Sequence, residues 1–446
     1  MKIKKFNIFI CIFFVAYTVF SQGNFRIINQ YKESVSMPFS LVNNLVVIKA
    51  KINGKELTFL LDTGIEKTIL FNLKFSDSLK LNSVKEVKLR GLGDGEPINA
   101  LISNNNLFRI NGIIDPHHRV YIIVDNLFDL SAKMGMDIHG IIGGDLFKDF
   151  VVKINYASKK ITFYNRDTFN YKNCKKCESF PLDFYNQKPF IDVFVENHLG
   201  DRFKVKLLID SGGGDALWLF DKSHPKIIIS DKYFEDYLGK GLNGNIYGKR
   251  SKIKKLIIGS FVFEDAAVAY PDSISIEAAQ KNKERNGSLG AEILKRFHII
   301  YDYANRKITL KKNNKYYRSP FMYNKSGIEL VYGGEMLIKE KRLNSNYIDS
   351  DGSKNMNSSI YQIVYSFGLS YKPSYQISFI RKGSPANLAG LLIGDIILEV
   401  NGTPAYQKEM SDIVQIFSQK ENKKVKLLVD RDGNHLRYSF YLKSMF

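Results

Sequence analysis

The chain has 446 residues, of which 44% are hydrophobic and 25% are charged. This composition excludes a wholly disordered or collagen-like chain, and the length allows about two to four domains with buried cores. The net charge is +20, but the lysines are scattered and no basic helix or RNA-binding motif accompanies them. We therefore expect no nucleic-acid partner and attribute the charge to compositional bias.

Residues 1–21 have the pattern of a secretory signal peptide. Three lysines precede an apolar run at 6–20, and small residues stand before the expected cleavage site at Gln22. An uncleaved membrane anchor is the weaker alternative, because the run is short and Asn7 interrupts it. We expect an exported protein without a stable membrane span, located in the periplasm or cell envelope or secreted.

The first candidate functional element follows a predicted hairpin. Two apolar stretches, 46–52 and 57–61, are separated by Asn53-Gly54, which is a strong hairpin signal. The second stretch leads directly into Asp62-Thr63-Gly64. A single aspartate in this position is commonly a turn residue that hydrogen-bonds to its own backbone.

Glycines gather at two further predicted hairpin tips, 90–95 (RGLGDG) and 240–245 (KGLNGN). Glycine permits positive backbone dihedrals and mobility, so each tip is either an ordinary surface turn or a flap over a binding site. The flap candidates are Gly91, Gly93, Gly95, Gly241 and Gly244.

Two cysteines remain after removal of the signal peptide, Cys174 and Cys177. In an oxidising compartment we expect a local disulfide within a connector at 167–180. A thioredoxin-like redox motif would need a strand before it and a helix after it. A zinc site would need a second pair of ligands, which the sequence does not provide.

The chain contains a repeat with an offset of 147 residues. The segment from Gly140, GIIGGDLFKDFVVKINYASKKITF, aligns without gaps with the segment from Gly287, GSLGAEILKRFHIIYDYANRKITL. Upstream, LTFLLDTG matches VKLLIDSG at almost the same offset, so that Asp210-Ser211-Gly212 corresponds to Asp62-Thr63-Gly64. Matches of this length predict two halves that share one fold.

Two similar lobes related by a pseudo-two-fold axis would bring these two aspartates face to face. Adjacent carboxyls share a proton, because the pKa of one of them is raised. The ionised carboxylate can accept a proton from water while the protonated carboxyl donates to a carbonyl oxygen, and this hydrolyses an amide without metal, cofactor or covalent intermediate. We predict Asp62 and Asp210 as catalytic residues, supported by Thr63, Gly64, Ser211 and Gly212.

With these motifs, residues 40–312 resemble exported aspartic peptidases of the retropepsin-like and pepsin-like group, with both lobes in one chain. Apolar-apolar-glycine elements at 141–143 and, less fully, 288–290 extend the resemblance. The resemblance implies that the two aspartates activate water, that the hydroxyl residues after them cross-brace the pair, and that the glycine-rich hairpins close over an extended peptide.

Three residues depart from the pattern of this family. Ile65 is bulkier than the residue that usually follows the catalytic glycine, Gly213 replaces a hydroxyl residue, and Ser288 replaces an apolar residue. These departures bear on catalytic efficiency and on the pH optimum. The single tryptophan, Trp218, lies just past the second motif, where we expect it to pack in the core.

The segment 383–404, GSPANLAGLLIGDIILEVNGTP, resembles the PDZ domain of exported bacterial proteases. The resemblance covers 325–446 and implies capture of a peptide C-terminus as an added strand. We expect a helix at 409–419 beside the groove and a polar loop near 344–359. Phe367, Gly368 and Leu369 are the candidate carboxylate-binding loop, with a plain turn between strands as the alternative.

Together these features predict a mostly β protein in which two duplicated retropepsin-like β-barrel lobes form one acid-protease unit, followed by an α+β PDZ domain. The expected order is signal peptide 1–21, first lobe 40–166, connector 167–180, second lobe 181–312 and PDZ domain 325–446. The expected function is an aspartic-type endopeptidase that acts on polypeptides as a monomer, without metal or cofactor.

Two other functions stay open. A degenerate peptidase cleft with a PDZ domain would make a catalytically inactive, peptide-binding adaptor of the cell envelope. A basic nucleic-acid binder is the more distant alternative. The presence of both aspartates favours the enzyme.

Overall fold

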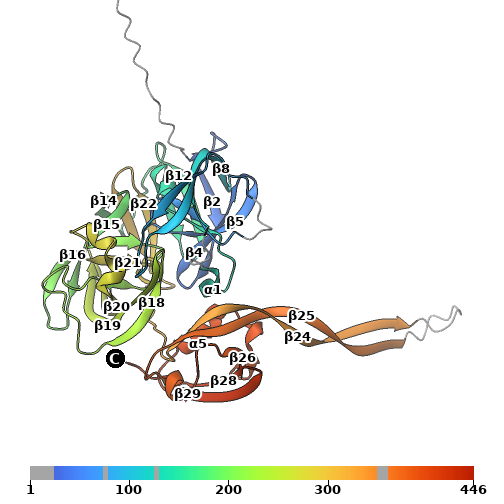
Figure 1. Cartoon of the computed structure of the whole chain (residues 1–446). Helices are drawn as coiled ribbons and strands as arrows, with labels where there is room; N and C mark the ends of the chain where they lie inside the picture. Colours follow the sequence, from blue (N-terminus) through green and yellow to red (C-terminus); the bar gives the residue numbers. More distant parts are fainter. Residues whose placement is uncertain (1–24, 74–78, 125–129, 349–359, 446) are drawn as a thin grey trace, which may run out of the picture.

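The computed structural model describes residues 25–73, 79–124, 130–348 and 360–445. Two β lobes lie side by side, and a smaller domain packs against them and extends a long two-stranded ribbon (Figure 1). The expected signal peptide lies outside the described residues, as do residues 349–359 of the expected polar loop. Residues 344–348, expected in that loop, instead form the end of a strand, because their backbone pairs with residues 360–364.

The first lobe is built on a nine-stranded sheet. The predicted hairpin is present, with Ile52 paired to Lys55 and positive φ at both Asn53 and Gly54. Its strands are β1 (Arg26–Ile27), β3 (Ser40–Val42), β4 (Leu45–Ile52), β5 (Lys55–Leu61), β6 (Thr68–Leu70), β7 (Lys85–Leu89), β8 (Ile98–Ile110), β9 (Ile113–Ile123) and β10 (Gly140–Ile142).

The second lobe repeats this topology on an eight-stranded sheet. β10 pairs parallel with β5 in the first lobe, and its counterpart β21 pairs parallel with β16 in the second. The strands of the second lobe are β14 (Asp183–Tyr185), β15 (Lys188–Glu196), β16 (Arg202–Asp210), β17 (Leu217–Leu219), β18 (Phe234–Gly241), β19 (Gly244–Ile258), β20 (Phe261–Pro271) and β21 (Gly287–Gly290). Two 3-10 turns, Ser273–Ile276 and Ala279–Lys281, lie between β20 and β21.

A six-stranded sheet joins the two lobes in the order β13-β23-β22-β11-β12-β2. The order is symmetric about the pair of β11 and β22, where Val152 lies opposite Tyr301. One continuous apolar core therefore spans both lobes. The strands are β2 (Ser34–Pro38), β11 (Phe150–Asn155), β12 (Lys160–Asn165), β13 (Cys177–Pro181), β22 (Phe297–Asp302) and β23 (Lys307–Lys312), and the short helices α1 (Ser131–Met134), α2 (Asp145–Lys148) and α3 (Ala291–Leu294) complete the lobes.

The C-terminal domain has its own apolar core. Ser384 caps the first helix, and its hydroxyl oxygen accepts a hydrogen bond from the Asn387 N–H. The elements are β24 (Ile328–Ile348), β25 (Ile360–Ile380), α4 (Pro385–Leu388), β26 (Ile396–Val400), β27 (Thr403–Pro404), a 3-10 turn at Ala405–Gln407, α5 (Met410–Phe417), β28 (Lys424–Arg431) and β29 (Asn434–Tyr441). The predicted fold class, two duplicated β lobes followed by an α+β domain, is confirmed.

Candidate active site

Asp62 and Asp210 occupy equivalent places at the ends of two buried strands. Asp62 follows β5 directly, and its N–H donates to the carbonyl oxygen of Ile142 at 2.9 Å. Asp210 is the last residue of β16 and lies opposite Gly290 in β21. The apolar runs before both aspartates are buried in the core, so each chain leaves the core at its aspartate.

The two turns are linked by reciprocal hydrogen bonds between the lobes. The Thr63 hydroxyl donates to the carbonyl oxygen of Ile209 at 2.7 Å and accepts from the Ser211 N–H at 3.1 Å. The Ser211 hydroxyl donates to the carbonyl oxygen of Leu61 at 2.9 Å and accepts from the Thr63 N–H at 3.0 Å. Thr63 and Ser211 are both buried, so these bonds hold the two turns in a fixed relation.

Glycine follows each hydroxyl residue because the carboxyls leave no room for a side chain. A Cβ atom on Gly64 would lie 3.0 Å from Asp62 Oδ1 and 2.9 Å from Asp210 Oδ1. These two contacts limit the separation of the Oδ1 atoms to about 6 Å. A Cβ atom on Gly212 would lie 2.2 Å from Asp62 Oδ2, so the second turn also approaches the carboxyl of the first.

Burial raises the pKa of both carboxyls. For Asp62, burial raises the pKa most and the charge of Asp210 adds to it, while the N–H of Gly64 donates to Oδ1 at 2.6 Å and opposes the shift. For Asp210, burial again raises the pKa, but the guanidinium of Arg285 is the largest opposing influence. The two carboxyls therefore lie in unequal electrostatic surroundings.

Two basic residues beside Asp210 were not predicted from the sequence. Arg285 is 6% exposed, and its guanidinium donates to the Ser288 hydroxyl at 2.7 Å and to the Gly287 carbonyl oxygen at 3.1 Å. Lys188 begins β15, and its charge lowers the pKa of both aspartates. Ser288, which departs from the family pattern, thus accepts a hydrogen bond from Arg285. A serine at an otherwise apolar position, three residues after an arginine, was the sequence signal for this contact.

The five flap candidates lie at two hairpin tips that contact each other. The tip between β7 and β8 meets the tip between β18 and β19, where the Asn243 N–H donates to the Leu92 carbonyl oxygen at 2.8 Å and the Gly95 N–H donates to the Asn243 carbonyl oxygen at 2.6 Å. The Asn243 side chain also bonds Gly91 and Glu96. The glycines fit this close contact: a Cβ atom on Gly241 would lie 2.1 Å from the Leu92 carbonyl oxygen, and Gly93 and Gly244 have positive φ.

The residues after the two glycines have structural roles in their own lobes. Ile65 packs against the smaller apolar cluster of the first lobe, and its carbonyl oxygen accepts from the Gly144 N–H at 2.8 Å. The Gly213 carbonyl oxygen accepts from the Ala291 N–H at 2.7 Å. Trp218, expected in the core, packs partly buried against the cluster around Phe220, and its indole N–H donates to a carboxylate.

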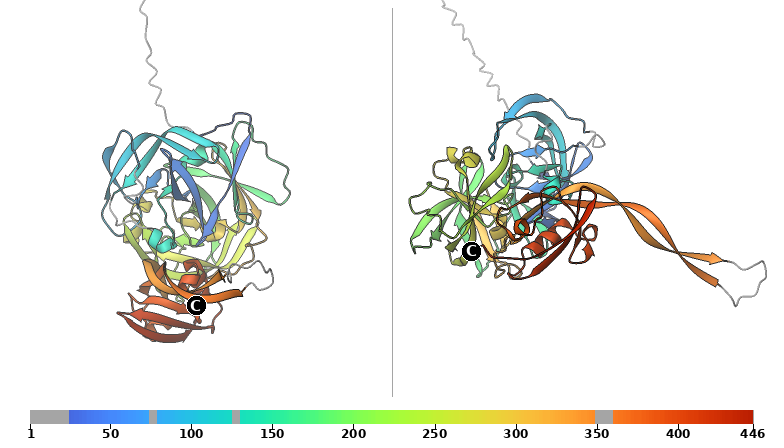
Figure 2. Two further views of the ribbon diagram at one scale, coloured as in Figure 1. Left: turned by 90° about the vertical axis from the view of Figure 1, so that its right-hand side faces the viewer. Right: turned by 60° about the horizontal axis from the view of Figure 1, so that its bottom comes forward.

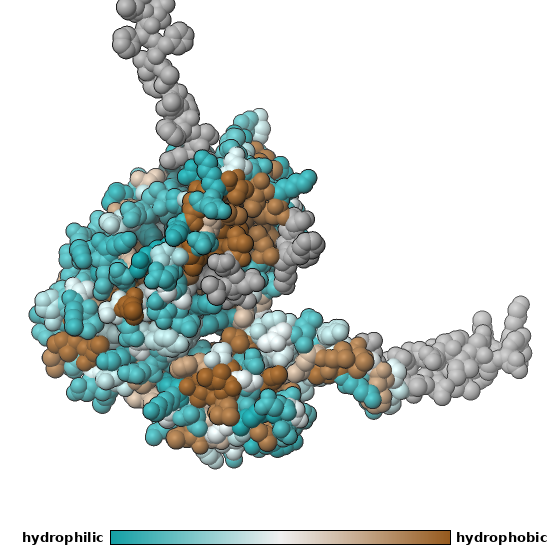
Figure 3. Space-filling view, viewed as in Figure 1, coloured by the Kyte–Doolittle hydropathy of each residue, from teal (hydrophilic) through white to brown (hydrophobic). Residues whose placement is uncertain are grey.

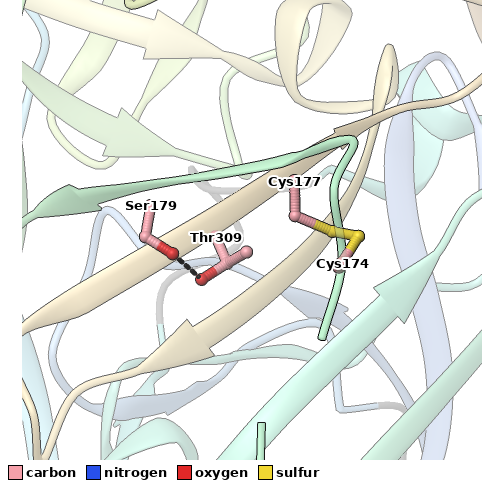
Figure 4. Close-up of a disulfide and its surroundings, with 4 residues drawn as sticks. All are labelled: Cys174, Cys177, Ser179 and Thr309. Atoms are coloured by element: carbon pink, nitrogen blue, oxygen red, sulfur yellow. Dashed lines mark hydrogen bonds between the residues drawn. A yellow bond between two sulfur atoms is a disulfide. The ribbon is translucent and has the colours of Figure 1, made fainter. Parts of the chain in front are cut away.

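Cys174 and Cys177 form a disulfide at the start of β13 (Figure 4). Residues 177–181, which we expected at the end of a connector and the start of the second lobe, form β13 and pair with β23, where the hydroxyls of Ser179 and Thr309 are 2.7 Å apart. The end of the expected connector is therefore part of the sheet that joins the lobes. Among the described residues, no group of three or more His, Cys, Asp and Glu side chains is arranged to hold a metal ion.

The prediction of a loop at Phe367, Gly368 and Leu369 is wrong. These residues lie inside β25 and pair with residues 339–341 of β24, because alternating aromatic and small residues favour a continuous strand. The turn that leads into β24 is instead 324–327, where the N–H groups of Ser326 and Gly327 donate to Asn324 Oδ1. A small residue, a glycine and an apolar residue directly before a strand were the signal for this turn.

Two parts of the chain match models of known protein families. Residues 48–146 match the family model described as aspartyl protease, and residues 376–431 match the model described as PDZ domain. Among solved structures, the aspartic proteinase from Irpex lacteus aligns with 12% identity and a TM-score of 0.41, over 65% of this chain and 99% of that chain. No curated protein matches the chain. The chain thus combines an aspartyl protease-like region, whose topology its second lobe repeats, with a PDZ domain.

Proposed function

We propose that the protein is an aspartic-type endopeptidase whose dyad is Asp62 and Asp210. The observation that carries the proposal is the pair of cross-braced aspartate turns, whose carboxyl oxygens lie within about 6 Å of one another. A raised pKa at Asp62 and a cation near Asp210 supply one proton donor and one proton acceptor in the same site.

In the first step, Asp210 accepts a proton from water as the water oxygen attacks the peptide carbonyl carbon, and Asp62 donates its proton to the carbonyl oxygen. In the second step, protonated Asp210 donates to the amide nitrogen as the C–N bond breaks, and Asp62 recovers a proton from the hydroxyl that becomes the new carbonyl. Both carboxyls then return to their starting states. The contacting hairpin tips must separate to admit an extended peptide.

Cleavage of a peptide library by the purified protein at mildly acidic pH tests this proposal. We expect Asp62→Asn and Asp210→Asn each to abolish cleavage without loss of folding, because each removes one of the two proton carriers. Asp145→Asn is the matched control, since Asp145 pairs with Lys148 at 2.6 Å at a partly exposed site in α2. Cleavage that survives either dyad substitution would exclude the mechanism.

We further propose that the PDZ domain binds a peptide C-terminus between β24 and α5. These two elements pack together, and β24 is the edge strand of its sheet; because α1 of the first lobe also packs against β24, an added strand would use the part of this edge that α1 leaves uncovered. The turn at 324–327 leads into that strand, and its Ser326 and Gly327 N–H groups, which donate to Asn324 Oδ1, would have to exchange that acceptor for the peptide carboxylate. A labelled peptide should bind with a free C-terminal carboxylate and lose binding when the carboxylate is amidated.

An absence of cleavage together with retained binding of C-terminal peptides would favour the adaptor function instead. Export is also a proposal, and the pattern of residues 1–21 and the Cys174–Cys177 disulfide support it. Among the described residues, no helix has the length and apolar character needed to cross a bilayer. Fractionation of cells and mass spectrometry of the mature N-terminus would test export.

A further inference from the structure

Beyond its pairing with the PDZ sheet, the β24–β25 hairpin extends as an isolated ribbon. A bulge between Tyr332 and Glu335 marks the point of departure, and pairing then continues to Ile348 and Ile360. β26 pairs with β25 only at Tyr375 and Gln376, close to the body. Two further views show the ribbon pointing away from both lobes (Figure 2).

One face of this ribbon exposes large apolar side chains. Alternate residues of a strand lie on the same face, and on β25 these are aromatic or aliphatic residues that are 57–70% exposed: Tyr365 57%, Phe367 64%, Leu369 64% and Tyr371 70%. Leu337, opposite Tyr371 on β24, is 53% exposed. Figure 3 shows apolar surface along this part of the ribbon. Single exposed apolar residues are ordinary, but a contiguous row on a projecting element indicates a contact surface.

Lysines are interleaved with the rings on the same face. Lys339 lies opposite Leu369 and Lys341 lies opposite Phe367. Their ammonium groups lie over aromatic rings, with Lys339 Nζ 4.6 Å from the Phe367 centroid and Lys341 Nζ 3.6 Å from the Tyr365 centroid. We call the seven residues Leu337, Lys339, Lys341, Tyr365, Phe367, Leu369 and Tyr371 the aromatic face.

The opposite face of the ribbon is different in character. There Glu340 pairs with Lys372 at 3.0 Å and accepts from the Ser370 hydroxyl at 2.8 Å, so these two charges balance each other, and the apolar Met336 and Ile338 on this face are half-buried. The aromatic face carries two cations and no acidic residue, and Glu335 is the nearest acid on the same side, closer to the body. The two faces therefore differ, because exposed apolar side chains and two cations gather on the aromatic face.

We propose that the aromatic face docks peripherally on an anionic lipid surface. Tyrosine and other rings favour the boundary between headgroups and acyl chains, and lysine can bury its aliphatic stem there while its ammonium reaches a lipid phosphate. A projecting ribbon can lie flat on a bilayer while the lobes stay in solvent. This inference is independent of the proposed peptidase activity.

The charge of the aromatic face argues against a second copy of the chain as its partner, and its size argues against a stable interface with another protein. A second copy packed face to face would bring Lys339 and Lys341 close to the same lysines of its partner, and like charges across strands are unfavourable. Its longer row, Tyr365 to Tyr371 on β25, spans six residue steps, ~20 Å, and the face is only two strands wide. That length is short for the ~800 Å² that each partner covers in a stable protein interface.

Vesicle co-flotation of the full chain tests the proposal. We expect binding to vesicles of phosphatidylglycerol mixed with phosphatidylcholine, weaker binding at high salt, and little binding to phosphatidylcholine alone. Phe367→Ser combined with Leu369→Ser should weaken binding by about tenfold or more, and Lys339→Gln combined with Lys341→Gln should remove the preference for anionic lipid. Ser370→Ala, on the opposite face, is the matched control and should bind like the unaltered chain.

A spectroscopic variant separates contact from loss of folding. Phe367→Trp keeps a large ring on the face, and its emission should shift to shorter wavelength with anionic vesicles, measured against a chain that contains only Trp218. Equal binding to neutral and anionic vesicles, or binding that survives both double variants, would overturn the proposal. Self-association without lipid that disappears in the Phe367→Ser, Leu369→Ser variant would also overturn it, in favour of a second copy.

Discussion

Arg381 of the PDZ domain and Asp236 of the second lobe form a buried ion pair across the boundary between the two domains. Arg381 Nε lies 3.1 Å from Asp236 Oδ1, and both side chains are 4% exposed. Arg250 also binds Asp236 at 2.8 Å and reaches Asp215 at 2.7 Å, five residues after Asp210. A continuous row of charges therefore connects the PDZ domain with a flap strand and with the loop that follows the second aspartate.

This row of charges predicts that substitutions of Asp236 and of Arg381 destabilise the domain boundary unequally. Asp236→Asn leaves the buried Arg381 and the partly exposed Arg250 without their shared partner and should destabilise the interface by about 3–5 kcal/mol. Arg381→Met should cost less, about 1–2 kcal/mol, because Asp236 keeps Arg250. Hydrogen exchange at the start of β24 measures both effects. A larger effect of Arg381→Met than of Asp236→Asn would contradict this account.

The reciprocal hydrogen bonds of Thr63 and Ser211 predict that substitutions of these two residues, far apart in sequence, reduce stability equally. Thr63→Ala and Ser211→Ala each delete two buried hydrogen bonds and leave backbone groups unpaired, so each should lower the free energy of unfolding by about 2–4 kcal/mol. Thr63→Ser keeps the hydroxyl and is the control. Urea unfolding measures the loss. The symmetry fails if only one of the two alanine variants is destabilised.

The raised pKa of Asp62 predicts how activity depends on pH. Its pKa is raised to about 7 by burial and by Asp210, so the proton that Asp62 must donate is lost as the pH rises through 7. On the proposed mechanism, kcat/KM should fall on the alkaline side of that value. It should also fall on the acidic side, where Asp210 becomes protonated. A profile that is flat from pH 5 to 9 would be incompatible with this pair.

The same shift has a consequence for stability with a definite sign. Between the ordinary pKa of an aspartate and the raised folded-state value, the folded chain binds more protons than the unfolded chain at this site. Stability from Asp62 is therefore fully present below the ordinary pKa and is lost as the pH rises through about 7. The variant Asp62→Asn should lack this decline, which thermal unfolding from pH 4 to 8 would detect.

We expect Arg285 to set the pH at which kcat/KM falls on the acidic side of its pH profile, the acidic limb. Its guanidinium favours the ionised form of Asp210, so Arg285→Met should raise the pKa of Asp210 and move the acidic limb of kcat/KM to higher pH. Ser288→Ala removes the hydrogen bond at 2.7 Å but keeps the charge, and should move the limb less. An acidic limb that stays in place in Arg285→Met would show that the arginine only supports the fold.

Contact between the flap tips predicts a local change in mobility. Asn243→Ala removes the side-chain bonds to Gly91 and Glu96 but keeps the backbone bonds. Hydrogen exchange at 91–96 should become faster, while exchange in the central sheet stays the same. Unchanged exchange at 91–96 would mean that backbone pairing alone holds the tips.

The sequence predicted the features that depend on local patterns and on the repeat. Apolar runs ending at Asp62 and Asp210, together with a matching offset, were sufficient to place the two aspartates at equivalent positions. The hairpin at Asn53-Gly54 followed from the dihedral preferences of those two residues. Each of these signals is either a pattern of a few neighbouring residues or a segment that occurs twice in the chain. Such signals can be recognised without knowledge of long-range contacts.

Features formed by residues far apart in sequence were not predictable in this way. Asp236 and Arg381 are separated by 145 residues, and neither stands in a recognisable motif. Arg285 approaches Asp210 only because β21 pairs with β16. The carboxylate loop was misplaced because a glycine between apolar residues at 367–369 resembled a turn, whereas the strand pairing of β25 continues through it.

Joining both lobes in one chain allows the two halves to diverge. The residue that corresponds to Arg285 at the repeat offset is Ile138, which is fully buried in an apolar cluster. An assembly of two identical subunits would carry either two such arginines or none, and its aspartates would be equivalent until a ligand distinguished them. When both lobes belong to one chain, a single mutation changes one lobe only. The sequence itself can therefore specify which aspartate donates a proton and which accepts one.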